Sequence, residues 1–443
     1  MNKITLNRIV FLLASAVAAA TFMSEASALP AFARQTGMEC TACHFQHFPL
    51  LNAFGRSFKS GAYTLMGTQG KVEGDRLSIP DTLNMAVLAT FGYEKTNQAP
   101  GVASTGTLTP GNGQFYVPAN GGELSLFYGG RVSENAGFLS ELGATGAAAT
   151  GSAKLPILFQ VADGTRAGIV PFTTDAQGAS YGFEVLNTGA NAMQQMSPVS
   201  GMNNAHSNAL SAQQYIGTGG GATGLAYVIN NPGYFVNLTK FNMTIPGNAA
   251  AGTASNFGST YARIAAMFDL AGWDTGVGVQ SWGGSSYSSA ATAQVATKAT
   301  AIDGQTQGTL GNMPTGLYVT YARAPYDAIV ANVYNMGGTL TRSSFNIAAE
   351  LGVLPGMATI GAAIRRGNSG VDDGTGSNAS DNAIMLTATY MVAQNMMASF
   401  TYTRNSGSFW NQVNPGTTVN PGGLTNTNLI GSKTTTFNVF TLF

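Results

Sequence analysis

Apolar and polar residues alternate along most of this chain, from about residue 81 to its last residue. Between residues 260 and 269, for example, one set of alternate side chains is mostly small or apolar, and the other carries Arg263 and Asp269. Successive side chains of a β-strand point to opposite faces, so this pattern puts one face on an apolar medium and the other on a polar one. About 16 such segments are predicted, and they begin near residues 83, 122, 137, 155, 180, 222, 233, 259, 273, 315, 327, 343, 357, 383, 396 and 434.

The composition fits strands that face lipid. The chain has 57 Gly, 24 Phe and 16 Tyr residues, and only 9% of its residues are charged, whereas soluble globular chains are about 25% charged. After the first residues, no apolar run is long enough for a transmembrane helix.

The connections between the predicted strands alternate in length. Short turns are followed by long polar loops such as 284–313, 366–381 and 405–432, and the last strand ends on Phe443. The stretch 162–179 breaks this alternation, because it is long where a short turn is expected. Short turns, long loops and an even number of strands are typical of bacterial outer-membrane barrels. The sequence therefore predicts an all-β, antiparallel barrel of about 16 strands in the bacterial cell outer membrane, in contact with its lipid, rather than a soluble β-sandwich or β-solenoid.

The first 28 residues have the features of a secretory signal peptide. Lys3 and Arg8 form a basic region, Ile9 to Ala20 is an apolar run, and small residues follow at 26–28. The run is too short to cross a bilayer as a helix, so we expect residues 1–28 to be removed. A retained helical anchor is the alternative.

A change in composition near residues 79–81 divides the remaining chain into two parts, 29–80 and 81–443. The first part contains the only two cysteines, in the sequence Cys40-Thr41-Ala42-Cys43-His44. C-x-x-C-H is the attachment motif of c-type haem. The two thiols add to the two vinyl groups on one edge of the haem, and the adjacent His44 supplies the proximal iron ligand.

Two other uses of this motif fit less well. A thioredoxin-like dithiol normally occurs in a βαβ context, and none is predicted here. A zinc site needs four ligands, and the chain has no second C-x-x-C. The sequence therefore predicts one covalently attached haem c, in a mono-haem cytochrome domain at residues 29–80.

The distal haem ligand has two candidates. Met66 lies 22 residues after His44, and a methionine thioether opposite a histidine raises the reduction potential. His47 is the alternative, but three residues after His44 it would share a helical face with that ligand. Ordinary apolar packing is the other interpretation of Met66.

Basic and aromatic residues surround the motif. Arg34, Arg56 and Lys59 are able to pair with haem propionates or with acidic groups of the barrel wall. About 50 residues do not form a stable core unaided, and a covalent cofactor supplies what is missing. Because a barrel of this size has a wide lumen, we expect this segment to plug or cap it. The aromatic residues available to bury a porphyrin are Phe32, Phe45, Phe48, Phe54, Phe58 and Tyr63.

The N-terminal segment resembles that of the fused outer-membrane cytochrome–porins that serve as iron oxidases in Fe(II)-oxidising bacteria. The resemblance covers about a tenth of the chain, and the barrel matches by pattern rather than by motif. It implies one haem c bound through Cys40, Cys43 and His44, and transfer of electrons from extracellular Fe(II) to a periplasmic c-type cytochrome or other carrier. The residues that carry it are Phe32-Ala33-Arg34-Gln35-Thr36-Gly37, the Cys40–His44 motif, Pro49, Leu51, Phe54-Gly55-Arg56, Phe58-Lys59 and Tyr63.

Three functions are compatible with this organisation. The expected one is an oxidoreductase that oxidises iron at the cell surface by outer-sphere electron transfer. The alternatives are a conduit of the same build for another donor or acceptor, and a solute porin with a regulatory haem. Asp372, Asp373 and Asp381 are candidate groups for iron to approach, although solvated loop carboxylates are the simpler interpretation. The net charge is zero and no basic stripe occurs, so a nucleic acid is not expected as a partner.

Overall fold

The computed structural model describes residues 30–96, 113–145, 148–189, 211–243, 257–287, 294–411 and 433–443. The predicted signal peptide, residues 1–28, lies outside the described residues.

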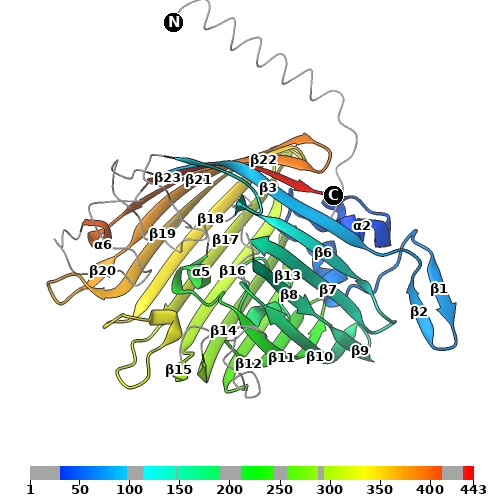
Figure 1. Ribbon diagram of the computed structural model, residues 1–443, viewed down its shortest axis with the longest axis horizontal. Helices are drawn as coiled ribbons and strands as arrows, with labels where there is room; N and C mark the ends of the chain where they lie inside the picture. The colour runs from blue at the N-terminus through cyan, green and yellow to red at the C-terminus, as the bar shows by residue number, and fades with distance from the viewer. Residues whose placement is uncertain are drawn as a thin grey trace, which may run out of the picture.

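The described strands form a closed antiparallel barrel with 16 strand positions (Figure 1). The last strand pairs with the first along nine residues, from Thr434 opposite Thr96 to Leu442 opposite Leu88, and this pairing closes the barrel. β8 and β9 share one position, because both pair with β10. The barrel strands are β3 (Met85–Thr96), β6 (Leu124–Arg131), β7 (Gly137–Thr145), β8 (Ala148–Lys154), β9 (Ile157–Ala162), β10 (Thr165–Thr174), β11 (Ala222–Asn231), β12 (Tyr234–Asn242), β13 (Ser259–Leu270), β14 (Trp273–Tyr287), β16 (Ala299–Leu310), β17 (Met313–Ala324), β18 (Arg342–Leu354), β19 (Ala358–Asp372), β21 (Asn382–Ala393), β22 (Met396–Ser406) and β23 (Lys433–Leu442).

Shorter elements precede the barrel or lie in its connections. They are α2 (Pro30–Thr36), α3 (Cys40–Cys43), α4 (Ala53–Ser60), β1 (Lys71–Gly74), β2 (Leu77–Pro80), β4 (Gln114–Pro118), β5 (Gly121–Gly122), η1 (Ala179–Tyr181), α5 (Ala212–Ile216), β15 (Gln294–Ala296), η3 (Val333–Asn335), β20 (Asn378–Ser380) and α6 (Ser408–Asn411).

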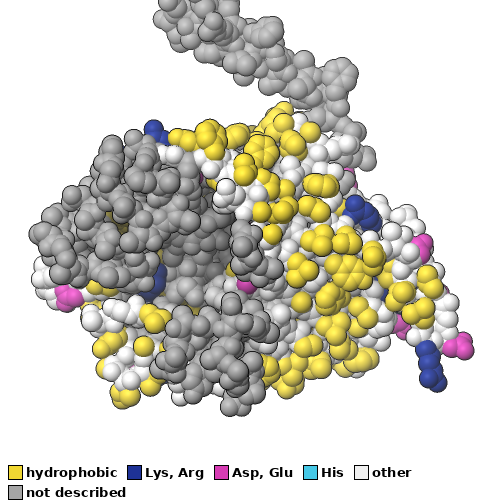
Figure 2. All heavy atoms as spheres, in the orientation of Figure 1, with side chains coloured by type: hydrophobic (Ala, Val, Ile, Leu, Met, Phe, Trp, Pro, Cys, Tyr) yellow, Lys and Arg dark blue, Asp and Glu magenta, His cyan; other side chains and the backbone are white. Residues whose placement is uncertain are grey.

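The barrel is apolar outside and polar inside. On β13, Ile264 is 57% exposed on the outer face, whereas Arg263, one residue earlier, is fully buried inside. Hydrophobic side chains cover much of the outer surface in Figure 2, and charges are sparse there. A closed barrel leaves no unpaired strand edge, so it satisfies the backbone within lipid. This is the construction of an outer-membrane barrel. The predicted antiparallel barrel of about 16 strands and its outer-membrane location are confirmed, whereas the cytochrome nature of the N-terminal segment stays a prediction.

No helix among the described residues is both long and apolar enough to cross a membrane.

The strand connections are short at one end of the barrel, which we call the short-turn end. The turns at 163–164, 271–272 and 311–312 have two residues each, and a glycine with positive φ occupies one position of each. Longer connections lie at the opposite end. In bacterial barrels the short turns face the periplasm and the long loops face outward.

Two of the predicted strands were misplaced. The segment near 180 is η1 and a coil packed inside the barrel, and the strand is β10, so the expected break at 162–179 does not exist. The segment near 327 is a loop, and the strand is β16, which falls in the predicted loop 284–313. Because two predicted strands are absent and two observed strands were missed, the predicted number of strands is still 16. β16 was missed because Thr and Gly occupy much of its outer face, which removes the apolar–polar contrast.

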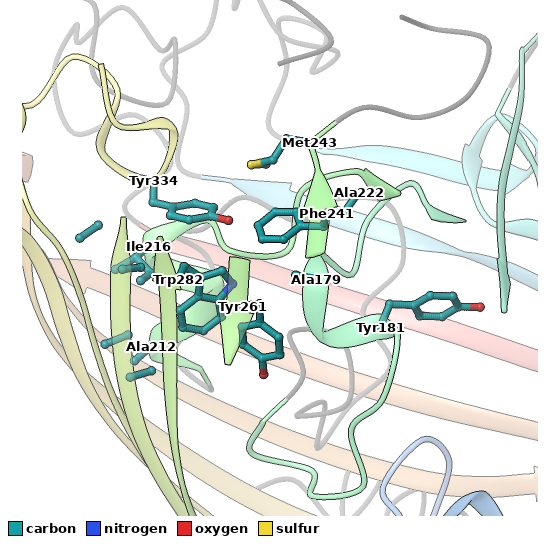
Figure 3. Close-up of a cluster of buried hydrophobic side chains, with 14 of the residues drawn as sticks. Ala179, Tyr181, Ala212, Ile216, Ala222, Phe241, Met243, Tyr261, Trp282 and Tyr334 are labelled. Carbon is teal, nitrogen blue, oxygen red and sulfur yellow. The ribbon is translucent and has the colours of Figure 1, made fainter. Parts of the chain in front are cut away.

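The connection between β10 and β11 folds into the lumen. Its described parts, 175–189 and 211–221, include η1 and α5. We call these parts the inserted segment. In the cluster that the inserted segment forms with the wall, the rings of Tyr261, Trp282 and Tyr334 lie close together, and Phe241 lies beside Tyr334 (Figure 3). The barrel interior is therefore packed on the side of β10 to β18.

A buried ion cluster also ties the inserted segment to the wall. Arg263 on β13 donates from Nε to Glu184 of the inserted segment at 3.0 Å, and its Nη1 and Nη2 donate to Asp303 on β16. All three side chains are buried. Thr188 adds a 2.7 Å hydrogen bond from its hydroxyl to Asp303 Oδ1.

Replacing Arg263 with Met should destabilise the barrel by about 3–5 kcal/mol, because it leaves two buried carboxylates without their cation. Urea unfolding of the detergent-solubilised protein, followed by tryptophan fluorescence, measures the change. Lys298→Met is the control, since the Lys298–Asp327 pair is exposed at the lysine, and such pairs contribute little. Equal unfolding midpoints for R263M and K298M would contradict the stabilising role given to the buried Arg263 ion cluster.

Candidate functional site

The N-terminal segment, residues 30–63, lies across the lumen at the short-turn end, and two ion pairs fasten it to the wall. Arg56 Nη2 on α4 lies 2.5 Å from Asp274 Oδ2 at the start of β14. His47 Nε2 lies 2.5 Å from Glu350 Oε1 on β18, and both side chains are buried. In Figure 1, α2 lies beside the C-terminus, where β23 ends.

Further hydrogen bonds extend these contacts between and around the ion pairs. Arg56 Nη1 lies 3.4 Å from Gln307 Oε1 on β16, and Gln307 Nε2 donates to the Tyr318 hydroxyl on β17 at 3.2 Å. Leu51 of the N-terminal segment also bonds to Asn187 of the inserted segment. The Leu51 amide donates to Asn187 Oδ1 at 2.8 Å, and Asn187 Nδ2 donates to the Leu51 carbonyl at 3.0 Å. The N-terminal segment is therefore held by the wall and by the inserted segment.

The C-x-x-C-H motif folds into one helical turn. The His44 amide donates to Cys40 O at 2.8 Å, and residues three apart on a helix face the same way, so both thiols lie on one face of α3. Asn52 Nδ2 donates to the Thr41 and Ala42 carbonyls at 3.1 and 3.0 Å, and caps α4 through its oxygen. Asn52 thus locks α3 against α4.

Gly55 permits the close packing of these two helices. A Cβ at this position would come within 2.0 Å of the Cys43 carbonyl oxygen. Any other residue would push α4 away from the motif.

The His44 ring presents one free nitrogen. Its Nδ1 lies 3.1 Å from the Leu50 carbonyl oxygen, which fixes the proton on Nδ1 and leaves the lone pair on Nε2. Burial lowers the pKa of His44 to about 4. The ring is therefore neutral over the physiological range, which is the form that binds metal.

The two cysteines are free thiols. Burial raises the pKa of Cys40 to about 12 and also raises that of Cys43. Two thiols on one face of a turn and a neutral imidazole with a free Nε2 are the donors that a c-type haem requires. The residues present therefore fit this group, with Cys40 and Cys43 as attachment points and His44 as iron ligand.

The structure gives His47 a structural partner at each nitrogen. Nδ1 lies 2.7 Å from the Phe48 carbonyl oxygen, and Nε2 faces Glu350. Binding to iron would require His47 to leave a buried carboxylate, so its role here is to anchor the segment.

Met66 is half-buried, and the chain on both sides of it is tied to α2. Gln35 Nε2 donates to the Tyr63 and Leu65 carbonyls, each at 2.7 Å, and the Gly67 amide donates to the Gln35 carbonyl at 3.0 Å. The role of Met66 as distal ligand stays a prediction.

The basic residues predicted to meet propionates have other partners in this structure. Arg34 donates to the Met85 carbonyl, and Arg56 has the wall carboxylate Asp274, which was the alternative considered for it. Lys59 is half-buried, and burial lowers its pKa to about 8, while the nearby Glu184 opposes this shift. Contact of these groups with propionates stays a prediction.

Asp381 is not a group that iron can approach, because it is fully buried. Arg365 Nη2 lies 2.6 Å from its Oδ1, and Trp410 donates to the same oxygen at 2.8 Å. Asp372 and Asp373 are in the exposed turn after β19, where their carboxylates accept amide hydrogens of that turn. Across the described residues, no three His, Cys, Asp or Glu side chains gather as a metal site.

Sequence reasoning missed the wall partners of the segment. Glu350 and Asp274 lie on strand faces that the alternation already predicts to be polar. No pattern within either strand shows which polar residue meets a segment more than 200 positions earlier.

Comparison with known proteins finds likeness in fold alone. No family model and no curated protein matches the chain. Among solved structures, the chain is similar to OmpF of Salmonella typhi, with 12% identity, a TM-score of 0.47, and coverage of 84% of this chain and 100% of that one. An anion-selective porin from Comamonas acidovorans has 10% identity, a TM-score of 0.46, and coverage of 82% and 99%. OmpT, an outer-membrane protein of Vibrio cholerae, has 8% identity, a TM-score of 0.44, and coverage of 84% and 100%.

Removing both wall carboxylates, in the double variant Glu350→Ala and Asp274→Ala, should loosen the N-terminal segment. The variant loses both ion pairs, including the carboxylate that the buried His47 Nε2 faces, and the loss of a buried partner costs about 1–3 kcal/mol. We expect higher and noisier single-channel conductance in planar bilayers than for the wild type. Glu94→Ala is the control, since Glu94 is a buried carboxylate bonded to Thr436 on the neighbouring strand. Conductance equal to that of the control would show that these pairs do not hold the segment.

Proposed function

We propose that this protein is an outer-membrane iron oxidase, which takes electrons from extracellular Fe(II) and delivers them to a periplasmic carrier. One haem c, held by Cys40, Cys43 and His44, would supply reversible one-electron storage. The overall reaction converts Fe(II) to Fe(III) while the carrier gains one electron. No proton is consumed or released in this balance.

The observation that carries the proposal is the place of the motif. Cys40 to His44 lie in a segment that crosses the lumen at the short-turn end and is fastened at Asp274 and Glu350. Short turns face the periplasm in bacterial barrels, so a haem held there is within reach of a periplasmic carrier. This position favours a redox role over that of an open solute porin.

The chain's own residues have three tasks in this function. Asn52 holds the two helices of the motif together, and the Leu50 carbonyl orients the His44 ring. His47 and Arg56 fix the segment to the wall. A rigid haem site limits the structural rearrangement that accompanies the change in haem charge on reduction, and this favours rapid electron transfer.

The outer mouth lies roughly 25 Å away across the apolar band. In this proposal Fe(II) enters the lumen from the outer end. Lumen-facing hydroxyls on the side of β19 to β23 pose no charge barrier to a divalent cation; they include Thr359, Thr389, Thr401, Thr403, Thr434 and Thr436.

Fe(II) as the donor rests on the resemblance of residues 32–63 to the cytochrome–porin iron oxidases. A conduit of the same build with another donor is the alternative, and it would use the same haem site. The identity of the electron donor is therefore tested by reaction of the protein with Fe(II), because the geometry of the haem site is the same for either donor.

Purified, oxidised protein mixed with Fe(II) in a stopped-flow spectrometer should develop the α-band of reduced haem. A potential titration of the same sample establishes whether the reaction is downhill. The double variant Cys40→Ser and Cys43→Ser should lack covalent haem on a denaturing gel. Met66→Leu should keep the haem and, if Met66 is the distal ligand, have a lower midpoint potential. A haem that stays oxidised although its potential allows reduction would exclude iron as donor, and wild-type protein without covalent haem would exclude the site itself.

A further inference from the structure

A blind cleft opens at the short-turn end between α4 and the wall. Its volume is about 320 Å³. Ser57 and Ser60 of α4 line one side, and lumen-facing residues of β10, β11, β13 and β14 line the other. Val185 of the inserted segment also lines it. We call this the mouth cleft, and the sequence patterns give no hint of it.

Two hydrogen-bond donors in the mouth cleft have no protein partner. Asn230 on β11 is 4% exposed, and its Nδ2 has no acceptor. A buried amide left unpaired is costly, so such a group indicates an acceptor that is not part of the chain. Arg166 on β10 is directly opposite Asn230 in the sheet register. Within the described part of the chain, no carboxylate pairs with Arg166.

The Arg166 guanidinium is directed at the N-terminal segment. A Cβ at Gly61 would lie 2.8 Å from its Nη1, so the guanidinium lies against the end of α4. It therefore stands at the junction between the segment and the wall.

The other charges of the mouth cleft are already engaged. Asp274 is paired with Arg56. Asp269 is exposed in its turn, where it accepts the Gly272 amide hydrogen at 3.0 Å. The charge left for a ligand is that of Arg166, so the mouth cleft favours an anion.

The floor of the mouth cleft is apolar. Pro232 and the partly buried Met267 line it, and Phe235 and Val185 are buried behind them. The volume is at the lower end of the range for ligand pockets, which starts at about 300 Å³. An occupant thus has a short apolar body and a group that accepts hydrogen bonds from Asn230 and Arg166.

We propose that the mouth cleft binds a small organic anion, a short-chain carboxylate, from the periplasmic side. Its carboxylate accepts from Arg166 and Asn230, and its chain covers Pro232 and Met267. Because the ligand touches both α4 and the wall, its binding adds to the attachment of the N-terminal segment. This inference does not depend on haem or on iron oxidation.

Titration calorimetry of the full-length protein in a non-ionic detergent, with hexanoate as the probe, tests the proposal. We expect saturable binding of hexanoate to the wild type. Arg166→Gln and Asn230→Ala should each raise the dissociation constant about tenfold or more, because each removes a hydrogen bond to a charged group. Arg166→Lys keeps the charge and should bind within a few-fold of the wild type.

Matched probes and variants separate this site from adventitious binding. Hexanol lacks the charge and hexylammonium reverses it, so neither should compete with hexanoate. Asp269→Asn should leave the affinity unchanged or improve it, whereas a site for a cation would be weakened. The proposal is overturned if the wild type does not bind hexanoate, if hexanol binds equally well, or if R166Q and N230A, shown to be folded by circular dichroism, bind like the wild type.

Discussion

The attachment of the N-terminal segment to the barrel wall is the interaction on which the rest of the structure depends. A barrel of 16 strands encloses a lumen that side chains of the wall alone do not fill. Here α2, α3 and α4 cross it at one end, and the inserted segment fills it from the other. The His47–Glu350 and Arg56–Asp274 pairs fix the first of these layers to β14 and β18. Without them the cysteine motif would have no defined place relative to the membrane.

Lipid on the outside forces the ionic groups inward, and this explains how such a plug is held. The outward faces carry apolar side chains such as Ile264, so polar partners remain only on lumen faces. Two buried ion clusters inside the barrel follow from this. One contains Arg263, Glu184 and Asp303, and the other contains Arg365 and Asp381. Each ties strands of the wall to each other or to a segment inside. The same arrangement leaves Arg166 and Asn230 facing an open cleft.

Much of the barrel could be predicted from sequence, because lipid on one side and polar groups on the other impose a two-residue period. The period failed where outer positions of β16 are Thr or Gly, and where Phe183 and Val185 alternate inside the lumen rather than in the wall. The motif residues Cys40, Cys43 and His44 were singled out from their spacing alone, and their role in binding haem stays a prediction. The contacts that hold this segment to the wall could not be predicted, because Glu350 lies 303 positions after His47 in the sequence. The burial of Asp381 could not be predicted for the same reason, because its partner Arg365 lies on the other side of a loop.

The central claim is that electrons leave this barrel through the haem at the short-turn end, while iron does not pass into the periplasm. Sealed vesicles containing the haem-loaded protein, with an oxidised small c-type cytochrome trapped inside and Fe(II) added outside, test it most directly. The account predicts reduction of the trapped cytochrome with the wild type and none with the double variant Cys40→Ser and Cys43→Ser or with empty vesicles. Equal reduction with the double variant would mean that iron itself passes through the barrel, and no reduction with the wild type would mean that no electron path exists. Either result would contradict the account.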